Sequence, residues 1–427
     1  MDIQTQAYAL PEQVRYEPYC IATYYCALDA GINARAKSAA LAVGQTIGTW
    51  TAVPGVTTEA LVHHLGKVLS VQEIPPYELI RPYAPGEKRH YILRIAFPEI
   101  NIGDQLPMLV TTLLGNDIST ALPVKLLDIE LSKEMASALH GPAFGISGLR
   151  ELTGVYDRPL ILNVLKPCTG FPPEAAIERL MDSARGGADV IKDDELLADP
   201  SFNRLSERMR LFSRAVQEVY EENGHRALYC ANITDRADRM FVHARRAVEI
   251  GCDMLMVNVP VAGLGMLQAL AADESIALPI LAHFAGFNAT TEALSAGMSS
   301  PLFLGKLMRL GGADAAILPS PYSAYPFPLE GFLEIARMMQ SPYYDVAPTM
   351  PVPGGGIHPA TAYEITTLLG KDIMVDVGGG IQGHPGGTAA GVQALQAAVS
   401  AAVNGQALAE KAAQSPALAQ ALAAWKK

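Results

Sequence analysis

Residues 159–165 read PLILNVL, and residues 188–192 read ADVIK. Both runs are short, apolar and bounded by Gly, Pro or polar residues, which is typical of strands buried on both faces of a parallel sheet. Six later runs repeat the pattern, with helix-length segments between them: 227–233 (ALYCANI), 253–259 (DMLMVNV), 279–284 (PILAHF), 313–318 (ADAAIL), 350–353 (MPVP) and 374–377 (MVDV). Eight such strands predict an α/β fold, a (β/α)8 TIM barrel; a doubly wound open sheet is the alternative.

The part of the chain before these runs has a mixed pattern. Strands and helices are expected at residues 20–28 (CIATYYCAL, strand), 33–43 (NARAKSAALAV, helix), 90–97 (HYILRIAF, strand) and 104–114 (DQLPMLVTTLL, helix). We therefore predict an N-terminal α+β domain over residues 1–145 and the barrel over residues 146–427. The Ala- and Gln-rich segment from Thr388 to Trp425 is expected to form a helical tail outside the barrel.

Composition narrows the class of protein. The chain has 427 residues, of which 50% are hydrophobic, and its net charge of −11 argues against nucleic acid or an anionic membrane as the main partner. It contains no apolar stretch of about 20 residues and no N-terminal signal pattern. Its five cysteines are an odd number without a CxxC pair, which fits a reducing compartment. We expect a cytoplasmic protein with a small-molecule ligand.

Polar residues gather where the predicted strands end, the place at which barrel enzymes carry their chemistry. Lys166 follows the first run, residues 192–195 (KDDE) follow the second, and His283 ends the fifth. Residues 192–195 fit either a lysine neutralised by neighbouring acids or a Mg2+ site, in which CO2 converts the lysine to a carbamate ligand. Lys166 could transfer a proton to or from the substrate, or it could only pair with a carboxylate. His283 could be a site residue or a core histidine whose hydrogen bonds are satisfied.

Two glycine runs, residues 354–356 and 378–380, follow the seventh and eighth predicted strands. Backbone N–H groups can close around an anion where side chains are absent, and many barrels bind phosphate after these two strands. Plain tight turns are the alternative. Two runs at the expected strands favour phosphate binding.

Several segments resemble ribulose bisphosphate carboxylase. Residues 187–195 (GADVIKDDE) resemble its carbamylated-lysine motif, and residues 378–385 (GGGIQGHP) resemble its terminal phosphate loop. Residues 48–51 (GTWT), 115–116 (GN) and 141–146 (GPAFGI) match further segments in order. The chain is identified as a member of this superfamily, of the carboxylase-like type. The resemblance implies a homodimer whose active sites lie between one subunit's barrel and its neighbour's N-terminal domain.

The resemblance also implies residue roles. Lys192, carbamylated by CO2, would bind Mg2+ together with Asp194 and Glu195. Lys166 would handle the substrate proton, and His283 would be the active-site histidine. The implied phosphate site comprises Thr49, Trp50, Gly356, Gly378 and Gly379. Asn116 would come from the partner subunit, near the metal ion and the substrate.

Three departures from the carboxylase bear on the substrate. Where the carboxylase holds its second phosphate with Arg, His and Ser, this chain has Phe284, an apolar residue near Ile317, and Gly354. Each lost charge-assisted hydrogen bond is worth about 1.5–3 kcal/mol, so a bisphosphate should bind poorly. Residues 318–325 (LPSPYSAY) also lack the lysine that polarises CO2 in the carboxylase. We therefore expect a protein that does not fix CO2.

The metal-binding residues and Lys166, which this chain shares with the carboxylase, suit reactions that proceed through a metal-stabilised enediolate. Residues 98–127 and 306–322 are similar to the 2,3-diketo-5-methylthiopentyl-1-phosphate enolases, but those enolases use a general-base lysine where this chain has Asn116. Decarboxylation needs no initial proton abstraction. The sequence alone therefore favours a lyase, a decarboxylase of a phosphorylated β-keto sugar acid of the 3-oxo-isoapionate 4-phosphate type. The alternatives are the enolase, a related transcarboxylase or hydrolase, and a non-catalytic sugar-phosphate-binding protein.

Overall fold

The computed structural model describes residues 6–49, 53–55, 57–76, 84, 86–120, 122–323 and 326–425. The chain divides into two compact units. The first comprises Met1–Leu139 with Gly286–Phe303, and the second comprises His140–Ala285 with Leu304–Lys427. The expected boundary after residue 145 stays a prediction, and no sequence pattern indicated that residues 286–303 group with the N-terminal part.

The first unit contains a four-stranded sheet in the order β2-β3-β1-β4. Its strands are β1 (Tyr19–Asp29), β2 (Lys67–Ile74), β3 (Lys88–Pro98) and β4 (Val124–Glu130). β1 lies in the middle and pairs antiparallel with both β3 and β4. Every second residue of β1 from Cys20 to Leu28 is buried, because alternate side chains of a strand point to opposite faces. The two predicted strands are confirmed as β1 and β3.

Short helices accompany this sheet. They are α2 (Pro11–Val14), α3 (Ala34–Gly44), α4 (Thr58–His64), α5 (Leu106–Leu114), α6 (Asn116–Thr120), α7 (Lys133–Ala138) and α14 (Asn288–Thr291), with the 3-10 turn η1 (Glu99–Asn101). The two predicted helices correspond to α3 and α5. Asn33 caps α3, since its side chain accepts a hydrogen bond from the backbone N–H of Ala36 at 3.0 Å.

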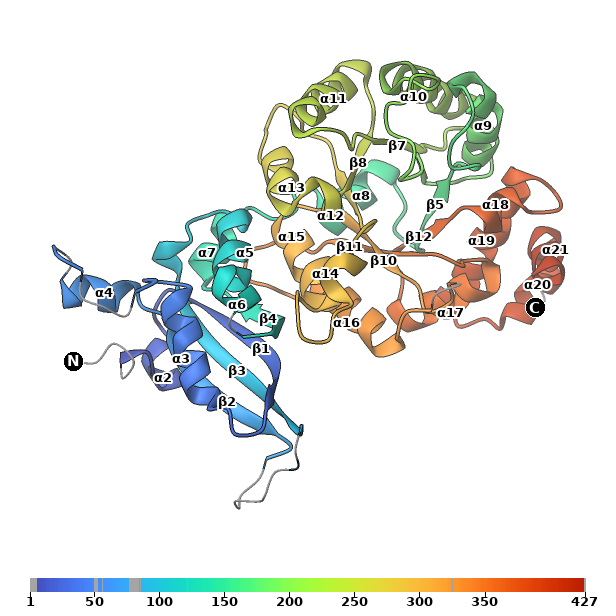
Figure 1. The fold of residues 1–427 in the computed structure, drawn as a ribbon. Helices are drawn as coiled ribbons and strands as arrows, with labels where there is room; N and C mark the ends of the chain where they lie inside the picture. The colour runs from blue at the N-terminus through green and yellow to red at the C-terminus, as the bar shows by residue number, and fades with distance from the viewer. Residues whose placement is uncertain are drawn as a thin grey trace. The chain divides into compact units, whose positions relative to one another are not determined.

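The second unit contains a closed barrel of eight parallel strands, which confirms the predicted fold class (Figure 1). Its strands are β5 (Leu160–Val164), β6 (Val190–Lys192), β7 (Leu228–Asn232), β8 (Met254–Asn258), β9 (Ile280–His283), β10 (Ala315–Pro319), β11 (Met350–Gly354) and β12 (Met374–Val377). Each overlaps one of the eight predicted runs. Every residue of β5, β7, β8 and β11 is buried, as strands covered on both faces require.

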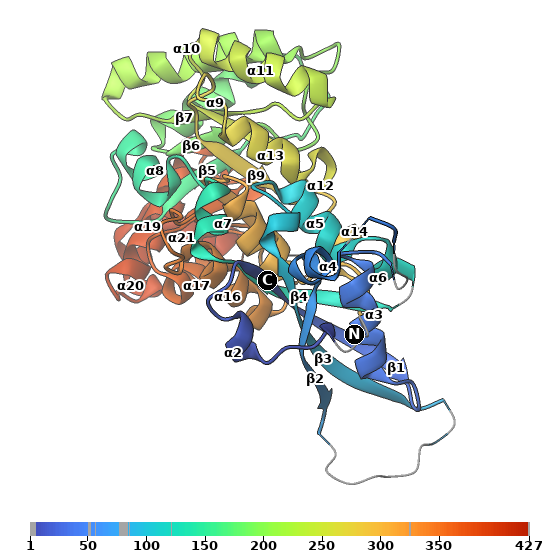
Figure 2. The same cartoon turned by 90° about the vertical axis from the view of Figure 1, so that its left-hand side faces the viewer.

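Helices surround the barrel strands; α10 and α11 lie side by side in both views (Figure 2). They are α8 (Gly145–Thr153), α9 (Ile177–Arg185), α10 (Leu205–Asn223), α11 (Ala237–Ile250), α12 (Val259–Ala262), α13 (Leu264–Ala271), α15 (Met308–Leu310), α16 (Leu329–Gln340), α17 (Pro359–Leu369), α18 (Gly379–Gln382), α19 (Thr388–Val403), α20 (Leu408–Gln414) and α21 (Pro416–Ala424). Two further turns are η2 (Pro173–Ala176) and the π-helical η3 (Pro301–Leu307). α19, α20 and α21 confirm the predicted helical tail. Within the described residues, no helix is both long and apolar enough to cross a bilayer.

Candidate active site

A cavity of about 600 Å³ lies at the carboxyl ends of the barrel strands. The sequence-predicted site residues that line it are Lys166, Lys192, Glu195, His283, Gly356, Gly378 and Gly379. The structure therefore brings most of the predicted barrel residues to one place. Several further lining residues were not predicted, and three of them carry side chains that can form polar contacts: His358, Asp376 and Trp425.

Lys192 ends β6 and points into the barrel, where its side chain is almost fully buried. Among the described residues its Nζ has one hydrogen-bond acceptor, the carbonyl oxygen of Asp193 at 3.3 Å. A buried ammonium with one long bond to a neutral acceptor is poorly stabilised. Among the described residues, Lys192 is therefore a buried amine at the cavity with hydrogen-bonding capacity to spare.

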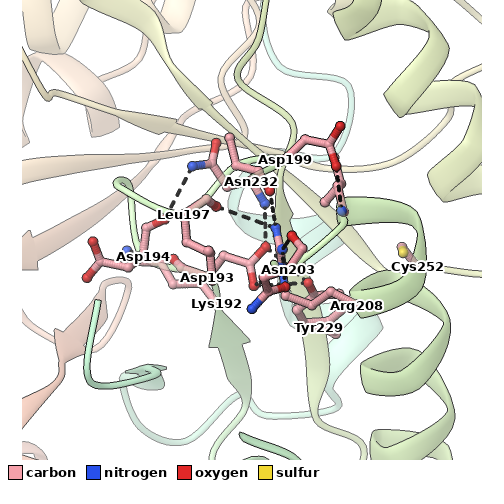
Figure 3. A network of polar contacts seen from close by, with 12 residues as sticks. Lys192, Asp193, Asp194, Leu197, Asp199, Asn203, Arg208, Tyr229, Asn232 and Cys252 are labelled. Atoms are coloured by element: carbon pink, nitrogen blue, oxygen red, sulfur yellow. Dashed lines mark hydrogen bonds and ion pairs between the residues drawn. The ribbon is translucent and has the colours of Figure 1, made fainter. Parts of the chain in front are cut away.

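Asp193 is held in a buried network rather than in the cavity. Its carboxylate accepts hydrogen bonds from Arg208 Nε, Tyr229 OH and the backbone N–H of Asn232, each at 3.0 Å. Burial raises the pKa of Asp193, and the Arg208 guanidinium opposes that rise. Figure 3 shows the Asp193 side chain directed toward Arg208 and that of Asp194 directed away from it. Asp193 thus fixes the turn that presents its two neighbours.

Asp194 forms a close ion pair with Lys166. Lys166 Nζ lies 2.6 Å from Asp194 Oδ2 and 3.1 Å from Cys168 Sγ. Burial acts to raise the pKa of Asp194, but hydrogen bonds from Lys166 and from the Leu196 N–H hold it below its ordinary value. Burial acts to lower the pKa of Lys166, but the hydrogen bond to Asp194 raises it overall. In this arrangement Lys166 is an ammonium, able to donate a proton.

Glu195 lies between His283 and two asparagines. Its Oε2 is 3.5 Å from His283 Nε2, and its carbonyl accepts hydrogen bonds from the side chains of Asn232 and Asn258 at 3.2 and 3.1 Å. His283 Nδ1 accepts a hydrogen bond from the Ala285 N–H at 3.0 Å. Burial holds the pKa of His283 well below its ordinary value, so the ring is neutral and its proton sits on Nε2, facing Glu195. His283 Nε2 therefore lies next to the Glu195 carboxylate.

The two glycine turns also line the cavity, and each of them lies close to a charged side chain. Gly356 has a φ of +69°, and a Cβ built on it would lie 2.2 Å from the carbonyl oxygen of Tyr322. A Cβ on Gly378 would lie 2.9 Å from Cε of Lys166. Glycine is thus required at both positions by local geometry. Their use as phosphate-binding turns stays a prediction.

Gly356→Ala is expected to distort its turn and to weaken binding of inorganic phosphate at least about tenfold. A left-handed non-glycine residue costs about 1–2 kcal/mol, and the clash with Tyr322 adds to this. Gly154→Ala is the matched control, because its φ is +70° and its added Cβ would meet nothing within 4 Å. Titration calorimetry with phosphate would show equal affinities in the two variants if the Gly356 turn plays no part.

The three positions that set this chain apart from the carboxylase all line the cavity: Phe284, Ile317 and Gly354. Phe284 stacks on His283 with ring centroids 5.0 Å apart. A Cβ on Gly354 would lie 3.0 Å from Asp376 Oδ2 and 3.1 Å from Ile317 Cγ2. This wall is apolar apart from one carboxylate, so it offers no cation to a second phosphate.

The remaining predicted site residues belong to the first unit or fall outside the described residues. Asn116 begins α6, and Thr49 follows α3. Trp50 lies outside the described residues. The roles expected for these three residues therefore stay predictions.

The residues that the sequence did not indicate come from β12 and from the end of the chain. Asp376 is a lone charged residue in β12, and that was the only available signal. Trp425 follows α21, and its ring stacks on His358 with centroids 6.3 Å apart. Nothing in the sequence near residue 425 indicates that the tail returns to the barrel mouth.

Comparison with known proteins identifies the family. Residues 145–318 and 334–425 match the catalytic domain of the ribulose bisphosphate carboxylase large chain. The chain belongs to this family. A ribulose bisphosphate carboxylase-like protein from Archaeoglobus fulgidus is 44% identical over 388 residues, covering 91% of this chain and 88% of the relative.

Other relatives narrow the comparison within the family. A 2,3-diketo-5-methylthiopentyl-1-phosphate enolase from Geobacillus thermodenitrificans is 39% identical over 405 residues, covering 95% of this chain and 97% of the relative. The crystal structure of a rubisco-like protein from Alicyclobacillus acidocaldarius superimposes with a TM-score of 0.87 at 31% identity, covering 95% and 100% of the two chains. Together with the apolar wall at Phe284 and Ile317, these similarities support a carboxylase-like protein that does not fix CO2.

Proposed function

We propose that the protein enolises a phosphorylated 2,3-diketone, as a 2,3-diketo-5-methylthiopentyl-1-phosphate enolase does. The observation that carries this proposal is the lining of the cavity, which combines charged groups, two glycine turns and the apolar side chains of Phe284 and Ile317. That wall suits an uncharged thioether end better than a second phosphate. The enolase relative, matched along 97% of its length, supports the same reaction. The similarity thus favours enolisation over the decarboxylation that the sequence alone favoured.

The donor set fits Mg2+. Asp194 and Glu195 supply carboxylate oxygens, the ligands that this hard cation prefers, and a carbamate on the poorly satisfied Lys192 would add a third. When bound, the ion supplies positive charge that stabilises an enediolate. Asp193 is excluded as a ligand because both its oxygens are engaged by buried donors. Mg2+ and the carbamate are parts of the proposal.

Side chains and backbone groups of the chain would transfer the proton and bind the phosphate. The Lys166 ammonium donates a proton to the substrate, and His283 fixes Glu195. The glycine turns at residues 354–356 and 378–380 receive the phosphate through backbone N–H groups. Thr49, Trp50 and Asn116 would complete the site from a partner subunit in a homodimer.

Decarboxylation of a phosphorylated β-keto sugar acid is the second candidate. The observation that favours it is Asn116, which stands where the resemblance places the enolase's base lysine.

One assay separates the two candidates. Protein with Mg2+ and bicarbonate should convert the diketo methylthiopentyl phosphate to a conjugated enol, which is measured by its ultraviolet absorbance. It should release no CO2 from 3-oxo-isoapionate 4-phosphate. CO2 release without enol formation would reverse the order of the two candidates.

Lys166→Met is expected to lower kcat about 10²–10⁴-fold with little change in KM, because methionine keeps the volume but donates no proton. Lys371→Met is the control, since Lys371 is exposed and lies outside the cavity. Steady-state enolisation kinetics measure both variants. A raised KM with unchanged kcat would assign Lys166 to substrate binding alone.

A further inference from the structure

Asp376 is a carboxylate in the otherwise apolar barrel strand β12. β12 reads Met374-Val375-Asp376-Val377, and the Asp376 side chain reaches the cavity. Its Oδ2 lies beside Gly354, where a side chain would crowd it. Its Oδ1 is buried and has no hydrogen-bond partner among the described residues.

The other acids and bases at the cavity are already engaged. Asp194 pairs with Lys166 at 2.6 Å, and Glu195 faces His283 Nε2 at 3.5 Å. His283 Nδ1 accepts the Ala285 N–H. Within the part of the chain that the structure describes, Asp376 is the carboxylate at the cavity that is left without a hydrogen bond or ion pair.

An unpaired carboxylate at this position lowers the stability of the folded chain. Burial raises the pKa of Asp376 to about 6. The positive charges of Lys192 and Lys166 oppose this rise. The negative charges of Glu195 and Asp194 add to it. Such groups are often retained at functional sites, where activity needs an arrangement that is unfavourable for folding. A carboxylate that lines a substrate cavity and has an oxygen not engaged by any described donor is suited to accept a proton from carbon.

We propose that Asp376 is the catalytic base of this site, an inference that rests on the proposed enolisation. The Asp376 carboxylate takes a proton from the carbon next to the substrate carbonyl. The electron pair of that C–H bond forms the C=C bond, and the carbonyl π pair moves to oxygen. The Lys166 ammonium then donates a proton to that oxygen, and the proton that Asp376 took from carbon passes through solvent back to the Lys166 amine. This route requires no base lysine at the position of Asn116.

The test compares Asp376→Asn with wild type and with Asp182→Asn, a control at an exposed carboxylate on α9. Asp376→Asn is expected to lower kcat for the diketo phosphate about 10²–10⁴-fold, with KM nearly unchanged. It is also expected to raise the midpoint of thermal unfolding, because the unpaired charge is gone. In Asp376→Ala, added formate should restore part of kcat, since the small carboxylate fits the space left by the side chain.

The outcomes separate the two proposals. A wild type that does not enolise the substrate overturns the proposed function and the inference that rests on it. An active wild type whose Asp376→Asn variant keeps its kcat overturns the inference alone. So does loss of kcat on His358→Gln with none on Asp376→Asn, because His358 Nδ1 is, within the described ranges, a second buried atom of the cavity lining that has no hydrogen-bond partner. Loss of activity with lower stability and no formate rescue would assign Asp376 a structural role.

Discussion

Lys192→Met is expected to abolish Mg2+ binding at the cavity and to lower turnover about 10³-fold or more. Methionine nearly matches the volume of lysine but forms no carbamate, so the donor set keeps only Asp194 and Glu195. Calorimetric titration with Mg2+, with and without bicarbonate, measures the affinity. Bicarbonate should strengthen Mg2+ binding in the wild type and have no effect in the variant.

The thermal stability of the Lys192→Met variant provides the control. Lys192 is buried, and among the described residues its Nζ has one hydrogen-bond acceptor, a neutral carbonyl, so replacing it should leave the thermal unfolding midpoint unchanged or raise it. Loss of activity with a stable fold then reports on the site. Mg2+ affinity equal to that of the wild type would contradict the assigned ligand set.

Arg208→Met is expected to lower the free energy of unfolding by about 3–5 kcal/mol, because it leaves the Asp193 carboxylate buried without its cation. Neither side chain of this pair is exposed, and their Nε–Oδ1 distance is 3.0 Å. Arg208 also donates to Asn203 Oδ1 and to the carbonyl of Ala198, each at 2.7 Å, and methionine loses both bonds. Urea denaturation followed by circular dichroism measures the change.

A nearby arginine gives the matched control. Arg204 is half exposed and its nitrogen lies 3.4 Å from Asp199, so Arg204→Met should cost about 1 kcal/mol or less. Adding Asp193→Asn to Arg208→Met should recover part of the loss by removing the stranded charge. Equal stabilities of the two single arginine variants would show that the buried pair does not hold the turn.

The barrel was predictable because its strands are buried on both faces, which gives each one a continuous apolar run ended by Gly or polar residues. In the first unit, β2 and β4 were missed. Several residues of β2 (KVLSVQEI) and β4 (VKLLDIE) are partly exposed, so neither shows a clear run or a strict alternation. Their pairing with β3 and β1 decides their structure, and pairing is not readable from local pattern.

The sequence predicted the location of the site more accurately than the role of each residue in it. Position at a strand end was enough to bring Lys166, Lys192 and His283 together. It did not show which of two adjacent aspartates faces Arg208, because Arg208 lies on another element. Asp376 Oδ1 has no hydrogen-bond partner among the described residues that could identify it, and Trp425 reaches the cavity only through the packing of the tail.

Proton exchange at carbon tests the central claim most directly. The wild-type protein, supplied with Mg2+, bicarbonate and the diketo methylthiopentyl phosphate in D2O, is followed by proton NMR. The proposed function predicts that the C–H signal next to the carbonyl is lost as the enol forms, with no loss of carbon from the substrate. Retention of that signal under these conditions, while phosphate and Mg2+ both bind, would contradict the account.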